Sequence, residues 1–152
     1  MALTRIPYRN TGYFSPLICD LIDGNPALDQ LISRPVEIGA FKVQLLEKQQ
    51  HYSSKTRKVL VDSLRDQYQA IDHKAAVDAH LTLLEKDTTF TFTTGHQLNL
   101  FTGPLYFFYK IISTINLCKQ LKTAYPNFDF VPIYWMATED HDFEEISFFH
   151  FQ

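Results

Sequence analysis

The spacing of apolar residues changes once along this chain, at Thr88, and that change limits the folds open to it. Before it, from Ser15 to about Asp87, apolar residues recur every three or four positions, which is typical of amphipathic helices. After it, the sequence TTFTFTT alternates β-branched with aromatic residues and predicts a strand. We therefore expect a mainly helical segment, residues 1–87, packed on a second unit, residues 88–152, within one domain.

Four helices are predicted in the first segment. Ser15 is a suitable N-cap and is followed by Pro at the first helical position, and Ser53 or Ser54 is a suitable cap for the third helix. The predicted ranges are 15–24, 34–50, 53–71 and 73–87.

A long apolar helix and a second strand follow the first strand. The helix, predicted from Pro104 to about Ala124, carries apolar residues on nearly all sides, so we expect other elements to cover more than one of its faces. The run FVPIYWMA, residues 130–137, does not alternate and is typical of a strand buried on both faces of a parallel sheet. Strand, helix and strand in this order predict a right-handed βαβ unit and therefore an α/β fold.

The sequence closes with a third strand-like run, ISFFHF, at residues 146–151. A parallel sheet of two or three strands would leave its edges uncovered, which favours aggregation. We therefore expect this chain to be the N-terminal part, or a fragment, of a longer protein.

Charge and cysteine content argue against several classes of function. A net charge of -3 gives no basic surface for a phosphate backbone, so nucleic acid is not an expected partner. No apolar run reaches the length of a membrane span and the first residues lack a secretory signal, so we expect a cytoplasmic protein without a membrane partner. Cys19 and Cys118 cannot form a disulfide framework or a four-ligand zinc site, and we expect two buried thiols.

The loop from Gly95 to Gly103 is the first candidate site. It follows a strand at its carboxyl end, where open α/β sheets bind ligands, and it leads to a helix N-terminus, where backbone N–H groups favour an anion. We expect it to meet a phosphate or carboxylate, although its spacing is neither Walker A nor G-x-G-x-x-G and a long βα loop without a ligand is the alternative. The lysine of the following helix is within reach of an anion, or is an ordinary surface lysine. The candidates are Gly95, His96, Gln97, Asn99, Gly103 and Lys110.

The cluster TEDHDFEE, residues 138–145, is the second candidate and follows the second strand directly. Its carboxylates repel one another, and a metal ion, a cationic substrate group or nearby Lys and Arg side chains would relieve the repulsion. In an extended segment Asp140 and Asp142 face one way and His141 the other, so not all of them can be ligands together. The alternative is a solvated acidic turn.

The segments TGHQLNLFTGPLYFFYK and FVPIYWMATEDHDFEE together resemble the BshC family, the cysteine ligases (cysteine-adding enzymes) of bacillithiol biosynthesis. Family members carry a TGQQ-like loop, a TGPLY-type helix start and a Pro-x-(Phe/Tyr)-Trp-x-Ala-x-Glu-Asp-His-Asp-Phe-x-Glu segment in this order. The resemblance covers essentially the whole chain. It departs from the family at His96, where most members have Gln.

The resemblance implies a Rossmann-like parallel sheet of the nucleotidyltransferase (HUP-like) type, related to class I aminoacyl-tRNA synthetases. For full-length members, which are several times longer, it implies more of this core, a connecting domain and a helical coiled coil that forms homodimers. The implied reaction joins the carboxyl of cysteine to the amine of glucosaminyl-malate in an amide bond. Activation of that carboxyl implies ATP or another nucleotide and an adenylate-like intermediate, and it leaves a role for Mg²⁺ open.

The resemblance also implies roles for the candidate residues. Glu139 and Asp140 would hold a substrate amine or a magnesium ion. Asp140, His141 and Asp142 would be catalytic, with His141 or Asp142 as the general base on the attacking amine. The isolated fragment would be inactive if the remaining portion supplies substrate contacts.

Two other functions stay open. One is a nucleotide- or anion-binding module without catalysis, in which the acidic turn contacts a partner chain. The other, a metal-dependent hydrolase, is less favoured because no second His-containing cluster supplies the remaining ligands.

Overall fold

The computed structural model describes residues 4–72, 74–97, 99, 103–140 and 148. The chain divides into two compact units, Met1–Gln44 and Leu45–Gln152. The expected boundary at residue 88 within a single domain stays a prediction. Within the described residues, no helix has both the length and the apolar character needed to cross a membrane.

The first unit consists of short helical segments. Helix α1 (Pro16–Ile22) begins as predicted, because the Ser15 hydroxyl accepts a hydrogen bond from the Ile18 amide. Gly24, at a φ of 70°, then turns the chain out of the helix. The 3-10 turns of this unit are η1 (Tyr8–Thr11), η2 (Pro26–Leu28) and η3 (Ile38–Ala40).

Helix α2 (Phe41–His51) begins later than the predicted range of 34–50. Pro35 disfavours a helical conformation at the residue before it, and Glu37 is extended, with φ -144° and ψ 154°. The apolar spacing of this stretch therefore predicted a helix whose first turns the backbone does not form.

The second unit carries the predicted strand, helix and strand. Its elements are α3 (Ser54–Gln67), α4 (Ala75–Leu84), β1 (Thr89–His96), α5 (Leu105–Ala124), β2 (Asp129–Met136) and the 3-10 turn η5 (Thr138–Asp140). Ser53 caps α3 by accepting a hydrogen bond from the Thr56 amide. Strand β1 continues through Gly95 and His96, so the loop begins later than the sequence predicted.

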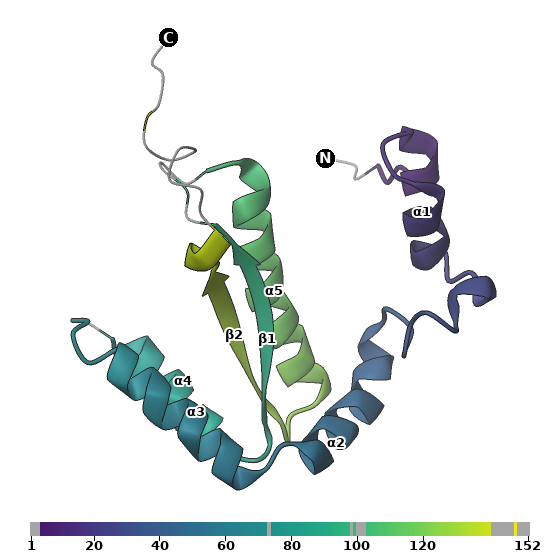
Figure 1. The fold of residues 1–152 in the computed structure, drawn as a ribbon. Coiled ribbons are helices and arrows are strands. Elements are labelled where there is room, and N and C mark those ends of the chain that lie inside the picture. Colours follow the sequence, from purple (N-terminus) through teal and green to yellow (C-terminus); the bar gives the residue numbers. More distant parts are fainter. Residues whose placement is uncertain (1–3, 73, 98, 100–102, 141–147, 149–152) are drawn as a thin grey trace. The chain divides into compact units, whose positions relative to one another are not determined.

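Strands β1 and β2 are parallel, as the sequence predicted, and pair in register from Thr89 opposite Asp129 to His96 opposite Met136. Figure 1 shows both arrows pointing the same way, with α5 lying alongside them. The carboxyl ends of both strands therefore meet at one edge, from which the polar loop and the acidic turn leave. The expected third strand, residues 146–151, lies outside the described residues except for Phe148.

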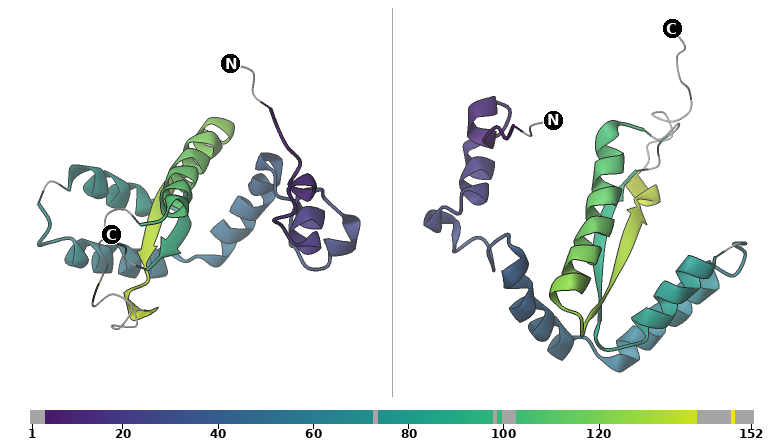
Figure 2. Two further views of the ribbon diagram at one scale, coloured as in Figure 1. Left: turned by 90° about the horizontal axis from the view of Figure 1, so that it is seen from above. Right: turned by 180° about the vertical axis from the view of Figure 1, so that it is seen from behind.

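The core lies between the sheet and the pair of helices α3 and α4, which run side by side in Figure 2. Since side chains alternate along a strand, Val131 and Ile133 face this helix pair, whereas Tyr134 faces α5. The fully buried members of this cluster come from α3, α4 and β2 and are Val61, Leu81, Leu84 and Val131.

A buried arginine ties the helix pair to the sheet. Arg57, on α3, is only 6% exposed, and its Nη1 donates hydrogen bonds to the carbonyl oxygens of Leu84 (2.9 Å) and Thr89 (3.1 Å). These carbonyls end α4 and begin β1. The guanidinium also lies over the Tyr52 ring, 5.1 Å from its centroid.

The expected cover of α5 on more than one side is not present among the described residues, whereas β2 is buried on both faces at its start and exposed at its end. Leu105, Tyr109 and Ile112 on α5 are 68%, 61% and 51% exposed, and Trp135 at the end of β2 is 57% exposed. The prediction for α5 was wrong for the described part of the chain because it took an apolar helix to be a covered one. Only the α5 face that carries Cys118 and Leu121 is buried.

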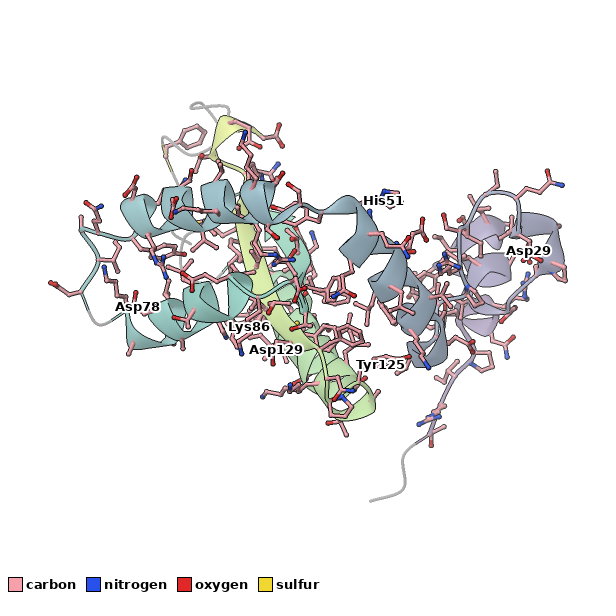
Figure 3. The ribbon with its side chains drawn as sticks, turned by 90° about the horizontal axis from the view of Figure 1, so that it is seen from below. Asp29, His51, Asp78, Lys86, Tyr125 and Asp129 are labelled. Atoms are coloured by element: carbon pink, nitrogen blue, oxygen red, sulfur yellow. The ribbon has the colours of Figure 1, made fainter. Side chains whose placement is uncertain are left out.

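Ion pairs between Asp129 and two lysines hold the start of β2. Asp129 accepts hydrogen bonds from Lys122 Nζ at 2.8 Å and from Lys86 Nζ at 3.5 Å, and Figure 3 labels Lys86 beside it. The hydrogen bond from Lys122 is the main cause that lowers the pKa of this carboxyl below its ordinary value of 3.8, against an opposing effect of burial. The pair thus joins the end of α5 to the first residue of β2.

We predict that Asp129→Asn destabilises the protein at neutral pH by at most about 1 kcal/mol, since both lysines are partly exposed. A carboxyl whose folded pKa is lowered stabilises the fold above its unfolded pKa and loses that contribution as pH falls through the folded pKa. The difference from wild type should therefore begin to shrink below about pH 4 and vanish as pH falls through the lowered pKa of Asp129. Urea unfolding at pH 7 and pH 3 measures it, with Asp87→Asn, an exposed carboxylate, as control; an equal difference at both pH values would contradict the assignment.

Candidate functional site

The loop after β1 and the turn after β2 meet at the common edge of the sheet. The Ala137 amide donates to the carbonyl oxygen of His96 at 3.3 Å, which continues the strand pairing by one step. Beyond it, the side-chain amide of Gln97 donates from Nε2 to Asp140 Oδ2 at 2.6 Å. This bond joins one residue of each cluster that the sequence singled out.

His96 is held on several sides. Its Nε2 lies 2.6 Å from the Tyr106 hydroxyl, and its Nδ1 lies 3.0 Å from the Gln97 carbonyl oxygen and 3.0 Å from Asn99 Nδ2. Its own carbonyl oxygen accepts a hydrogen bond from the Tyr134 hydroxyl at 3.1 Å. Burial raises the pKa of Tyr134, which keeps this hydroxyl protonated and able to donate. The contacts fix both the ring and the backbone of His96.

Sequence reasoning missed Tyr106 and Tyr134 as parts of this region. Both lie in runs of apolar residues, whose pattern indicates packing and not a polar site. The available signal was a phenolic hydroxyl, which can donate or accept a hydrogen bond, at a helix start or a strand end.

Lys110 reaches back from α5 to the strand end. Its Nζ donates to the Gly95 carbonyl oxygen at 3.2 Å and lies 5.4 Å from the centroid of the Tyr106 ring. The side chain is exposed, so its ammonium group remains accessible to an anion. The structure therefore places this cation beside the loop.

Gly95, near the end of β1, and Gly103, in the loop, both lie where a side chain would clash with a neighbour. A Cβ on Gly95 would lie 2.9 Å from the Trp135 carbonyl oxygen on the paired strand, and one on Gly103 would lie 2.6 Å from Asn99 Cβ. Gly103 also has a φ of 59°, which a side chain disfavours. Only glycine fits either position without movement of its neighbours.

The first turn of α5 has no side-chain cap. Pro104 occupies the N-cap position, and proline offers no oxygen or amide that could bond the first backbone N–H groups. Among the described residues, the Phe107 amide bonds the Pro104 carbonyl oxygen at 2.9 Å, and the amides before it have no side-chain cap from Pro104. A phosphate or carboxylate suits them, because the helix dipole favours negative charge there.

The acidic turn differs from the extended segment that the sequence predicted. Residues Thr138–Asp140 form a 3-10 turn, closed by a hydrogen bond from the Asp140 amide to the Ala137 carbonyl. Glu139 accepts a hydrogen bond from Trp135 Nε1 at 3.1 Å. The expected alternation of side chains therefore does not apply at Asp140, and its carboxylate points to Gln97. The candidates His141 and Asp142 lie outside the described residues.

Metal ligation has no assembled site in the described part of the chain, where no three His, Cys, Asp or Glu side chains come together as a ligand group. In the described part of the acidic turn, Glu139 accepts a hydrogen bond from Trp135 and Asp140 accepts one from Gln97. A magnesium ion therefore stays a prediction, and it would need ligands from a nucleotide or from further residues.

A family model and several known proteins that match this chain carry the same name. The family model described as "Bacillithiol biosynthesis BshC, N-terminal Rossmann-like domain" matches residues 1–152. Proteins named "Putative cysteine ligase BshC" are similar to this chain at 55% identity over 148 residues in Flavobacterium psychrophilum, and at 54% over 145 residues in Christiangramia forsetii. These matches cover 97% and 95% of this chain but 28% and 27% of the relatives, so the chain spans little more than a quarter of their length.

We predict that Gly95→Ala destabilises the protein by about 1–3 kcal/mol, because the new methyl group must displace the backbone of the paired strand. Urea unfolding measures the change. Gly39→Ala is the matched control, since a Cβ there meets only Glu37 Oε1 at 3.8 Å. Equal stabilities of the two variants would show that β1 and β2 do not approach as closely as the structure has them.

Proposed function

Because the chain belongs to the BshC family of bacillithiol biosynthesis, as its N-terminal Rossmann-like domain, we propose that the full-length protein ligates cysteine to glucosaminyl-malate. The structural observation that supports this proposal best is the Gln97–Asp140 hydrogen bond. It joins the anion-favouring loop to the acidic turn at the carboxyl ends of parallel strands, where α/β sheets bind ligands. A ligase of this kind needs both a phosphate group and an amine at one site.

On this proposal the loop binds the phosphates of a nucleotide substrate. Uncapped amides at the start of α5 and the ammonium of Lys110 supply positive charge there, and Gln97 and Asn99 supply side-chain amides. On the other side, Glu139 and Asp140 attract the ammonium group of a substrate. His141 or Asp142 then removes a proton from that group before it attacks.

The chemistry balances in two steps. An oxygen of the cysteine carboxylate attacks the α-phosphorus of ATP, a P–O bond forms, and pyrophosphate leaves. The neutral amine of glucosaminyl-malate then attacks the acyl carbon, an amide bond forms, and AMP leaves with the attacking oxygen. The proton released by the amine passes to the general base.

The cysteines of the chain agree with a cytoplasmic site of action. Cys19 and Cys118 are both buried and unpaired, as the sequence predicted, and burial raises the pKa of Cys118, which favours the neutral thiol. Free thiols persist in reducing compartments.

We predict that the full-length protein, given cysteine, glucosaminyl-malate, ATP and Mg²⁺, forms the amide product and AMP. With ¹⁸O in the cysteine carboxylate, AMP should carry one labelled oxygen, which mass spectrometry detects. Label in inorganic phosphate would contradict the adenylate route. Nucleotide binding without any product would instead favour a non-catalytic binding module.

We predict that Asp140→Asn reduces turnover at least about 100-fold, within the usual effect of an acid–base or charge-stabilising group. The Asn side chain keeps an oxygen that can accept the Gln97 hydrogen bond, so the fold should be retained and only the charge is lost. Steady-state kinetics with a thermal unfolding curve measure both properties. Asp62→Asn, on α3, is the control for loss of an exposed carboxylate, and unchanged turnover of Asp140→Asn would remove this residue from the site.

A further inference from the structure

Both ring nitrogens of His96 have partners within the protein. Nε2 lies 2.6 Å from the Tyr106 hydroxyl and Nδ1 lies 3.0 Å from the Gln97 carbonyl oxygen. The ring also stacks at a tilt against Tyr106, with centroids 5.1 Å apart, and meets the edge of Phe107 at 6.2 Å. A histidine held in this way cannot bind an anion through Nε2 unless it first releases Tyr106.

The two neighbours of Nδ1 favour different tautomers of the ring: the Gln97 carbonyl oxygen suits a protonated Nδ1, and the Asn99 amide suits an unprotonated one. The Gln97 carbonyl oxygen accepts from Asn99 Nδ2 at 2.9 Å, and a carbonyl oxygen has a second lone pair for another donor. If Nδ1 carries the proton, it supplies that donor, and Nε2 accepts from the Tyr106 hydroxyl. In the other tautomer Nδ1 accepts from Asn99 Nδ2 at 3.0 Å and Nε2 donates to the Tyr106 hydroxyl, so the bond to Tyr106 forms in either tautomer.

We propose that Tyr106 is a positioning residue, which holds the His96 ring so that Nδ1, together with Asn99, fixes the Gln97 backbone and directs the Gln97 side chain to Asp140. The inference rests on the proposed function for its consequence in ligand binding. It gives His96 a role different from the direct anion contact that the sequence suggested. The anion then meets the loop that His96 supports, and not the imidazole ring.

The surroundings of Tyr106 support this role. The residue lies in the first turn of α5, so a bond to His96 fixes the helix start against the end of β1. The Lys110 ammonium lies over its ring at 5.4 Å and also bonds the Gly95 carbonyl, which holds the phenol from a second side. Tyr106, His96 and Lys110 thus close a ring of contacts around the strand end.

The first test follows the hydrogen bonds directly in the full-length protein. With ¹⁵N-labelled histidine and glutamine, long-range ¹H–¹⁵N spectra distinguish the two tautomers and show whether Nε2 is hydrogen-bonded; His96→Gln identifies the His96 signal. Tyr106→Phe should move the Nε2 signal towards that of an unbonded nitrogen and shift the side-chain amide signals of Gln97. The control Tyr109→Phe removes a hydroxyl from the same helix, at an exposed position, and should change neither.

The second test measures affinity for ATP with Mg²⁺ by calorimetry. Tyr106→Phe should weaken binding about five- to tenfold, the effect of one hydrogen bond of about 1–1.4 kcal/mol. In a His96→Ala background the same change should have no further effect, because its partner is gone. His96→Gln should retain most of the affinity, since its amide can accept the tyrosine hydroxyl bond and so replace the ring nitrogen.

The outcomes separate the two roles of His96. If the ring contacted the anion directly, Tyr106→Phe would free Nε2 and would leave affinity unchanged or raise it, and that result overturns the proposal. Additive losses in the double variant, or unchanged Nε2 and Gln97 signals in Tyr106→Phe, overturn it as well. If the wild-type protein binds no ATP, the proposed function fails in that respect, while the signals of His96 and Gln97 still decide the positioning role.

Discussion

In the parallel pair of β1 and β2, Gly95 lies opposite Trp135 and His96 opposite Met136, so both strands end at the same edge of the sheet. The approach is so close at Gly95 that no Cβ fits, and the next step is closed by the bond from Ala137 to the His96 carbonyl. Were the register different by one residue, the side chains would exchange faces and Gln97 would lose Asp140. The site therefore depends on this pairing more than on any single polar residue.

Local chemistry made much of the fold predictable. Ser15 and Ser53 mark helix starts because their hydroxyls satisfy backbone amides, and the alternating run from Thr88 fits only a pleated strand. The errors concern packing, which depends on residues distant in sequence. The apolar outer face of α5 and the end of β2 look like buried surface in a sequence, yet Tyr109 and Trp135 are largely exposed in the described part of the chain.

The site was partly predictable for the same reason. Gly95, Gly103 and the amide side chains between them indicate a loop whose backbone tolerates only glycine at some positions. In the structure, a Cβ on either glycine would lie too close to a neighbour, and Gly103 has a positive φ. The hydroxyls of Tyr106 and Tyr134 could not be placed, because their partners, a ring nitrogen and a carbonyl of His96, become neighbours only after β1, α5 and β2 have packed. A turn at Asp140 likewise replaced the expected extended segment.

The two faces of the sheet end carry different chemistry. His96 and Tyr106 lie on the side of α5, together with the cation of Lys110 and the uncapped helix start. On the acidic turn, Glu139 bonds Trp135, whose side chain lies on the opposite face of β2. A ligand that crosses the strand ends would thus meet positive charge at one end and negative charge at the other. Such a field orients a molecule with a phosphate and an ammonium group, which are the groups that activation of a carboxylate and attack by an amine require.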